Sequence, residues 1–280
     1  MFHAEKMCPE DFPFAVGLAN TLGWDMANVD FEYMLSLEPD GCFVLWQDEE
    51  RVGMATCVGY GKIGWFGNLA VKPEFRRKGA GTFLVKHAVQ YLRSKGVETI
   101  GLYAYQHLVG FYGKVGFHPF DDFVVLNGTA RKTNSGRGAA TKVGMKDIPA
   151  LVEIDAHCMG WNRKRLFDSV FHEEGNLCYY SAANGEIRGF VMAKVYGEMA
   201  EIGPLMCERD PKRVGIGLIK TMLAELEGLD VYAYAPANET EILDLLLQAG
   251  LREKFRVTRM FLGSVAAKSC VYMPESLERG

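Results

Sequence analysis

The sequence lacks three features that would assign it to a common class. Its 280 residues contain no run of about 18 apolar residues, so no membrane-spanning helix and no membrane partner are expected. Basic residues are not in excess: the formal net charge is −4 and the pI is near 5.9, which argues against a nucleic-acid partner. The first residues, MFHAEKMCPEDF, carry charges where a signal peptide needs its apolar stretch, so we expect no secretory signal.

The cysteine and histidine spacings match no metal-binding or disulfide motif. The seven cysteines are odd in number and contain no C-x-x-C pair, which is typical of reduced thiols in a cytoplasmic protein. The six histidines have no metal-ligand spacing, and the adjacent His157 and Cys158 are poorly placed to share one ion. We therefore expect a cytoplasmic protein without a metal.

Two similar halves are present. Length and a hydrophobic content of 49% suggest two globular domains. Gly79-x-Gly81 recurs as Gly215-x-Gly217, GLYAY recurs as DVYAY, and Gly116-Phe117 recurs as Gly250-Leu251, each roughly 130 residues later and in the same order. The Gly-, Thr- and Asn-rich stretch between the halves is typical of a linker. We expect domains at 1–128 and 141–280, joined by a linker at 129–140.

Within the first half, strand-like and helical patterns alternate. Residues 41–47, 51–60, 63–71 and the stretch VETIGLYAY are strand-like, whereas apolar residues recur at helical spacing after Gly79 and the helix ends at Lys95-Gly96. A short helix and a last strand, DDFVVLNG, follow. A strand, a turn, a helix and a further strand form a right-handed crossover, so the fold class is α/β with a mixed sheet.

The stretch AVKPEFRRKGAGTFLVKHAV predicts an anion site. Three cations, Arg76, Arg77 and Lys78, directly precede Gly79-Ala80-Gly81 at the start of a helix. Helix N-termini have unpaired N–H groups and a partial positive charge, and glycine allows close approach of the backbone. The string is neither a P-loop nor a dinucleotide fingerprint, because G-x-x-x-x-G-K-[ST] is absent and Leu84 stands where G-x-G-x-x-G needs its third glycine.

A third pattern fits. VKPEFRRKGAG resembles the acyl-CoA-binding motif of the GNAT superfamily of N-acetyltransferases, V-x-P-x-x-[QR]-x-x-G-x-[GA], and GFYGKVGF at 110–117 resembles the family's later motif around a tyrosine. The resemblance covers the first half. It implies tandem GNAT-like domains, each with a mixed, mostly antiparallel twisted sheet flanked by helices, and acetyl-CoA as co-substrate.

The resemblance also implies roles for individual residues. The N–H groups of Arg77, Lys78, Gly79, Ala80, Gly81 and Thr82 would bind the pyrophosphate, and Arg76 would orient the loop. The backbone of the preceding strand, at Leu69, Ala70 and Val71, would bind the pantetheine arm by strand addition.

Acetyl transfer from a thioester to an amine needs a neutral amine and a protonated leaving thiolate. Tyr112 matches the family's general acid; otherwise it is an ordinary packing tyrosine. The general base is missing, because Trp65 occupies the family's frequent carboxylate position and no Asp or Glu occurs from Ile63 to Lys72. Trp24 and Asp25 are candidates for the acceptor pocket, although Trp24 could serve only in packing.

The second half departs from the motif. Lys212 stands at the Arg76 position and Leu246 at the Tyr112 position, so this half resembles a degenerate GNAT domain. We expect direct transfer from acetyl-CoA to a primary amine in a ternary complex. The alternative is a non-catalytic acyl-CoA-binding sensor or scaffold. A small amine, an amino acid, an antibiotic-like polyamine and a protein lysine all remain open as the acceptor, and so does the oligomeric state.

Overall fold

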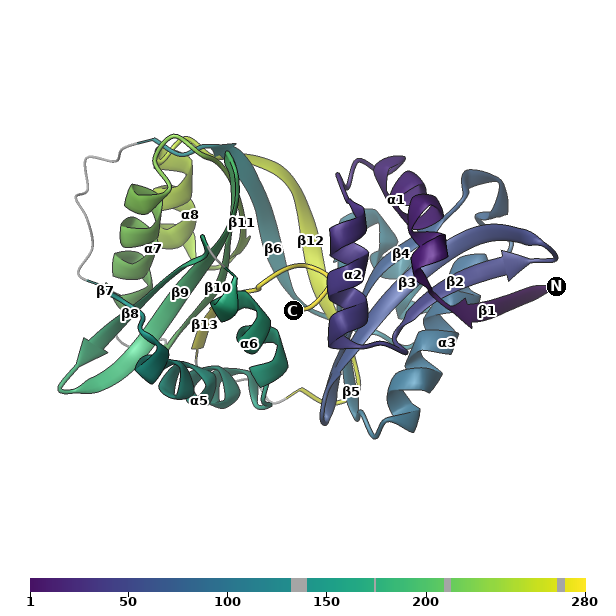
Figure 1. The fold of residues 1–280 in the computed structure, drawn as a ribbon, viewed down its shortest axis with the longest axis horizontal. Helices are drawn as coiled ribbons and strands as arrows, with labels where there is room; N and C mark the ends of the chain where they lie inside the picture. The colour runs from purple at the N-terminus through teal and green to yellow at the C-terminus, as the bar shows by residue number, and fades with distance from the viewer. Residues whose placement is uncertain (132–139, 174, 209–212, 266–269) are drawn as a thin grey trace.

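A computed structural model describes residues 1–131, 140–173, 175–208, 213–265 and 270–280. Figure 1 shows two lobes side by side, each a twisted sheet with helices against it. The first half of the chain contains β1 (Phe2–Lys6), α1 (Phe12–Asn20), α2 (Asn28–Leu37), β2 (Cys42–Gln47), β3 (Glu50–Tyr60), β4 (Ile63–Val71), α3 (Ala80–Ser94), β5 (Thr99–Tyr105), α4 (Val109–Gly113) and β6 (His118–Thr129). The second contains β7 (Thr141–Lys142), α5 (Ile148–Met159), α6 (Lys164–His172), β8 (Leu177–Ala183), β9 (Glu186–Tyr196), β10 (Met199–Glu208), α7 (Arg213–Glu225), β11 (Asp230–Pro236), α8 (Thr240–Gln248), β12 (Arg252–Leu262) and β13 (Cys270–Met273).

The order of elements repeats. Each half begins with a strand and two helices, continues with three strands, a helix, a strand and a helix, and then has a long strand, β6 or β12. The described strand pairs are antiparallel except β4 with β5 and β10 with β11, which are parallel. The expected tandem of α/β domains with mixed, mostly antiparallel sheets is confirmed.

Helices cover both faces of the first lobe's sheet. The buried side of α3, with Leu84, Val85, Ala88 and Leu92, packs on Phe43 and Leu45 of β2. The neighbouring residues Cys42 and Val44 point to the opposite face and pack under α1 and α2. This alternation along β2 is what a strand buried on both sides requires.

The long strands are exchanged between the halves. In the described part of the chain, the strands of both lobes form one continuous sheet of 13 strands, whose central order is β5-β12-β6-β11. β12 from the second half pairs with β5, from Val257 opposite Tyr105 to Leu262 opposite Ile100. β6 from the first half pairs with β11, and β6 and β12 pair with each other between the lobes (Figure 1). Each lobe is therefore completed by a strand from the other half of the chain.

β4 and β5 pair only at one end. Their parallel pairing runs from Ile63 to Trp65 of β4 and stops there. On the β3 side the register shifts beyond Gly67, and Asn68 has a left-handed backbone with φ +50°. A bulge of this kind bends a strand and turns it away from its neighbour. The two strands therefore separate after Trp65 and leave an opening in the sheet.

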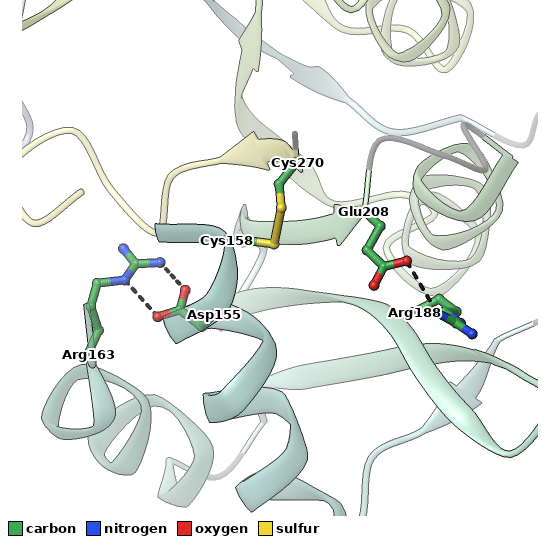
Figure 2. Close-up of a disulfide and its surroundings, with 6 residues drawn as sticks. All are labelled: Asp155, Cys158, Arg163, Arg188, Glu208 and Cys270. Atoms are coloured by element: carbon green, nitrogen blue, oxygen red, sulfur yellow. Dashed lines mark hydrogen bonds and ion pairs between the residues drawn. A yellow bond between two sulfur atoms is a disulfide. The ribbon is translucent and has the colours of Figure 1, made fainter. Parts of the chain in front are cut away.

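The corresponding opening in the second lobe is occupied by β13. β10 pairs with β11 from Met199 to Ile202, and from Leu205 to Glu208 it pairs with β13 instead. Cys158 of α5 and Cys270, the first residue of β13, form a disulfide (Figure 2). The expectation of reduced thiols throughout is therefore wrong for this pair. Because 112 residues separate the two cysteines, local spacing could not reveal the contact.

The segment Pro274–Gly280 follows β13 and returns to the space between the lobes, where Figure 1 marks the end of the chain. It contains buried charged groups: Glu275 is 0% exposed and Arg279 is 5% exposed. On the first lobe, the Trp65 indole N–H donates to Leu277 O at 3.2 Å. On the second, Arg163 donates to Gly280 O. The segment is thus held by both halves of the chain.

Candidate active site

A cavity of about 540 Å³ lies in the opening between β4 and β5. Phe66 and the following residues of β4 line one side, and Tyr103 to Tyr105 of β5 line the other. Val257 of β12 and the segment Pro274–Gly280 add residues from the second half of the chain. Such a cavity between strands and domains is a common form of small-molecule site.

Seven of the residues singled out from the sequence line this cavity: Trp24, Leu69, Ala70, Val71, Arg76, Arg77 and Tyr112. They come from the loop before α2, from β4, from the turn before α3 and from α4. Lys78 to Thr82 do not line it but follow directly at the start of α3. Asp25 does not line it either.

The turn before α3 has the backbone of an anion site. Arg77 and Gly79 both have left-handed conformations, with φ +59° and +92°, and α3 begins at Ala80. The N–H groups of Gly79, Ala80, Gly81 and Thr82 have no backbone acceptor among the described residues. Arg76 Nε donates to Val71 O at 2.8 Å, which ties the turn to the end of β4. An anion here would meet free N–H groups at a positive helix end.

Tyr112 lies on α4 and is only 6% exposed. Its ring packs edge-on against Phe66, Phe111 and Phe117, and no described residue forms a hydrogen bond with its hydroxyl. Burial raises its pKa well above the usual value for tyrosine. The hydroxyl is therefore protonated and available as a hydrogen-bond donor inside the cavity.

The loop before α2 separates the two acceptor-pocket candidates. Trp24 lines the cavity, and its indole N–H donates to the Tyr105 hydroxyl at 3.1 Å. Asp25 is exposed and has a left-handed backbone, with φ +56°. Burial and the carboxylates of Asp230 and Asp25 raise the pKa of Tyr232, so Asp25 lies near the second lobe.

Trp65 occupies the strand position where GNAT proteins often have a carboxylate as general base. It is 1% exposed, its ring lies 5.5 Å from that of Tyr103, and its N–H anchors Leu277. The cavity does have one carboxylate, Glu278, which sequence reasoning missed. Glu278 belongs to no motif and lies about 200 residues from the acyl-CoA motif in the sequence. No local signal therefore places it in the cavity, and its position is evident only from the folded structure.

The second lobe differs from the first at the positions that correspond to the cavity and to Tyr112. Leu246 is fully buried in the core between α8 and the sheet. β13 takes the place between β10 and β11 that the cavity has in the first lobe. Lys212 lies outside the described residues. Gly215 packs against β10, where an added Cβ would lie 3.1 Å from Cys207 Sγ.

Two kinds of feature are absent among the described residues. No helix among them has the length and apolar character needed to cross a membrane. No three His, Cys, Asp or Glu side chains in the described part of the chain are grouped as a metal site would require.

Family models match both halves. Residues 10–117 match the acetyltransferase (GNAT) family, and residues 151–270 match an acetyltransferase (GNAT) domain. The chain belongs to the GNAT superfamily of acetyltransferases and carries two GNAT domains in tandem. The comparison with curated protein sequences found no match.

Solved structures resemble the whole chain. A protein named as an acetyltransferase from Pyrococcus horikoshii is 25% identical with a TM-score of 0.81, over 100% of this chain and 96% of the other. A GCN5-related N-acetyltransferase from Sphaerobacter thermophilus is 16% identical with a TM-score of 0.68, over 96% and 98%. A tandem GNAT protein from the clavulanic acid biosynthesis pathway is 15% identical with a TM-score of 0.63, over 96% and 100%. The last two support the fold.

Proposed function

We propose that this protein transfers an acetyl group from acetyl-CoA to the nitrogen of a primary amine, directly and in a ternary complex. The observation that carries the proposal is the convergence of three parts on one cavity. These are the separated end of β4, the turn before α3, which reaches the cavity through Arg76 and Arg77, and Tyr112. Together they match what a thioester with a pantetheine arm and a pyrophosphate requires.

The cofactor would lie along β4 and end at α3. Beyond Trp65, β4 has no pairing with β5, so the backbone of Leu69, Ala70 and Val71 can pair with the amide groups of pantetheine. The pyrophosphate would accept hydrogen bonds from the N–H groups between Arg77 and Thr82. Arg76, Arg77 and Lys78 are exposed there and would add positive charge.

Tyr112 would donate its proton to the leaving thiolate. Burial raises the pKa of Tyr112, so its hydroxyl is protonated at neutral pH and can donate to the sulfur. No cysteine lines the cavity. Of the free thiols, Cys8 is exposed and has a pKa of about 11, raised mainly by hydrogen bonds to Glu10 and Asp11. These features favour direct transfer over an acyl-cysteine intermediate.

The division of labour is also a proposal. The first domain, 1–128, would bind acetyl-CoA, and the second, 141–280, would close the acceptor side below Trp24 and Asp25. The linker at 129–140 lies mostly outside the described residues. We propose a small-molecule or peptide amine as the acceptor and a cytoplasmic location, the latter because five free thiols are present.

A non-catalytic acyl-CoA sensor is the competing function, and the absence of a strand carboxylate near the thioester favours it. Two measurements distinguish the two functions. One is thiol release from acetyl-CoA with and without a panel of primary amines, and the other is acetyl-CoA binding by calorimetry. An enzyme gives amine-dependent release. Tight binding with no release for any amine would identify a sensor.

A further inference from the structure

The segment Pro274–Gly280 brings a carboxylate from the second half of the chain into the cavity of the first. Glu278 lines the cavity together with Tyr112, and its side chain is 24% exposed. The segment touches β4 where it leaves β5: a Cβ added to Gly67 would lie 2.4 Å from the Glu278 Cβ and 2.6 Å from its Cα. Glu278 is thus beside the strand proposed to bind the pantetheine arm.

Hydrogen bonds fix the chain on both sides of Glu278. The Trp65 N–H donates to Leu277 O at 3.2 Å, and the Tyr60 hydroxyl donates to Arg279 O at 3.1 Å. A catalytic group needs such support, because a shift of about 1 Å can cost much of its effect.

The ion-paired cluster that contains Glu278 has one carboxylate more than it has cations. Lys194 pairs with Glu201 at 2.6 Å and with Glu275 at 2.5 Å. Arg279 pairs with Glu275 at 2.8 Å and with Glu278 at 2.8 Å. Three carboxylates therefore share two cations in this cluster of described residues. Glu278 is the member that lines the cavity, so a cationic ligand there would balance the remaining charge.

We infer that Glu278 binds the ammonium group of a cationic acceptor amine and removes its proton before acetyl transfer. This inference rests on the proposed acetyl transfer and names its missing base. It also defines the substrate class: an amine that is protonated at neutral pH, in contrast to a weakly basic aromatic amine.

The proton balance is complete. Glu278 takes one proton from the ammonium, and the neutral nitrogen attacks the thioester carbon to form the C–N bond. The C–S bond breaks, and the Tyr112 hydroxyl protonates the departing sulfur. The nitrogen loses a second proton as the amide forms, and that proton restores Tyr112. The proton on Glu278 leaves to solvent, so the products are the amide, the CoA thiol and one proton.

Burial raises the pKa of Glu278 above 4.5; Arg279 opposes this, and Glu201 and Glu275 reinforce it. A raised pKa makes the carboxylate a better base. The charged groups that act on Glu278 all come from the second half of the chain: Lys194, Glu201, Glu275 and Arg279, with Tyr234 beside them. The other titratable groups that line the cavity are Arg76, Arg77, Tyr103, Tyr105, His107 and Tyr112.

The test compares Glu278→Gln with wild type and with Glu241→Gln, a matched change at an exposed residue of α8. Acceptor kcat/KM is measured from pH 6 to 9 with the best alkylamine of a panel, and acetyl-CoA affinity is measured by calorimetry. We expect Glu278→Gln to lower kcat/KM on the order of a hundredfold at pH 7 without changing acetyl-CoA affinity. Its remaining activity should rise about tenfold per pH unit, because it must use the free amine. Glu241→Gln should match wild type.

The outcomes are distinct. Wild-type kcat/KM and an unchanged pH profile in Glu278→Gln would overturn the inference while leaving the proposed function intact. If wild type releases no thiol with any amine, the proposed function fails first. Should Glu278→Gln not fold, Glu278→Asp decides: it keeps the charge but shortens the side chain by one methylene. A positioned base loses roughly tenfold or more in kcat/KM, whereas a charge with a merely structural role leaves it unchanged.

Discussion

Replacing Tyr112 by Phe removes one hydroxyl and keeps the ring. The ring contacts with Phe66, Phe111 and Phe117 remain, and the hydroxyl has no protein hydrogen-bond partner to lose among the described residues. The free energy of unfolding should therefore change by no more than about 0.5 kcal/mol. Acetyl-CoA affinity should also be preserved, because the turn before α3 is untouched.

Turnover should fall in contrast. Loss of general-acid help to the thiolate should lower kcat on the order of a hundredfold, or about 2.7 kcal/mol in the activation barrier. The assay is thiol release under single-turnover conditions, so that chemistry is measured and product release is not. Tyr180→Phe on β8 of the second lobe is the matched control. A Tyr112→Phe variant with wild-type single-turnover rate would assign Tyr112 to packing and refute the reasoning.

Three further outcomes are expected. Gly79→Glu should abolish acetyl-CoA binding, measured by calorimetry, because no protein atom lies within 4 Å of the added Cβ and the carboxylate would occupy the anion site. Gly79→Ala adds the same backbone strain at φ +92° without the charge, so this variant should bind acetyl-CoA more tightly than the Glu variant. Equal affinity of both variants, or a stoichiometry of two in wild type, would contradict a single site in the first domain. Burial raises the pKa of Glu275, but Arg279 and Lys194 outweigh this and hold it well below 4.5. The stability that ionised Glu275 contributes is therefore present above pH 4.5 and is lost as pH falls below 4.5. Glu275→Gln should then weaken the acid dependence of the melting temperature. If wild type and variant have the same acid dependence, this cluster does not govern acid stability. A fragment of residues 1–134 lacks β12, the partner of β5, and should show no cooperative melting; a folded fragment that acetylates the same acceptors would show that the second half does not shape the site.

The anion turn could be predicted from the sequence because its signals are local. Arg76, Gly79 and Gly81 lie within six residues at the start of α3. The left-handed backbone at Gly79 and the free N–H groups of Gly79, Ala80 and Gly81 follow from glycine at a helix start. Tyr112 was accessible for the same reason, since its motif sits at a fixed distance before Gly116. The repeat of elements also followed from features that recur in order.

The parts that could not be predicted depend on pairing between distant segments. Both β6 and β12 begin with largely polar, exposed residues and continue with a short apolar stretch, and nothing in this pattern says which of β5 and β11 each will join. Glu278 is separated from Gly67 by most of the chain, and its place depends on the pairing of β13 with β10 and on the Cys158–Cys270 bridge. Asp25 shows that sequence proximity to a site residue does not place a side chain in the site: Trp24 lines the cavity, and the adjacent Asp25 does not.

The central claim, direct acetyl transfer to a primary amine, is tested most directly by following the acetyl group itself. The wild-type protein is incubated with isotopically labelled acetyl-CoA and a metabolite and peptide extract, and both the small molecules and the intact protein are analysed by mass spectrometry. We expect the label on the nitrogen of a primary amine and none on the protein. Label on a cysteine of the chain, or acetyl-CoA bound without any labelled amine, would contradict the account.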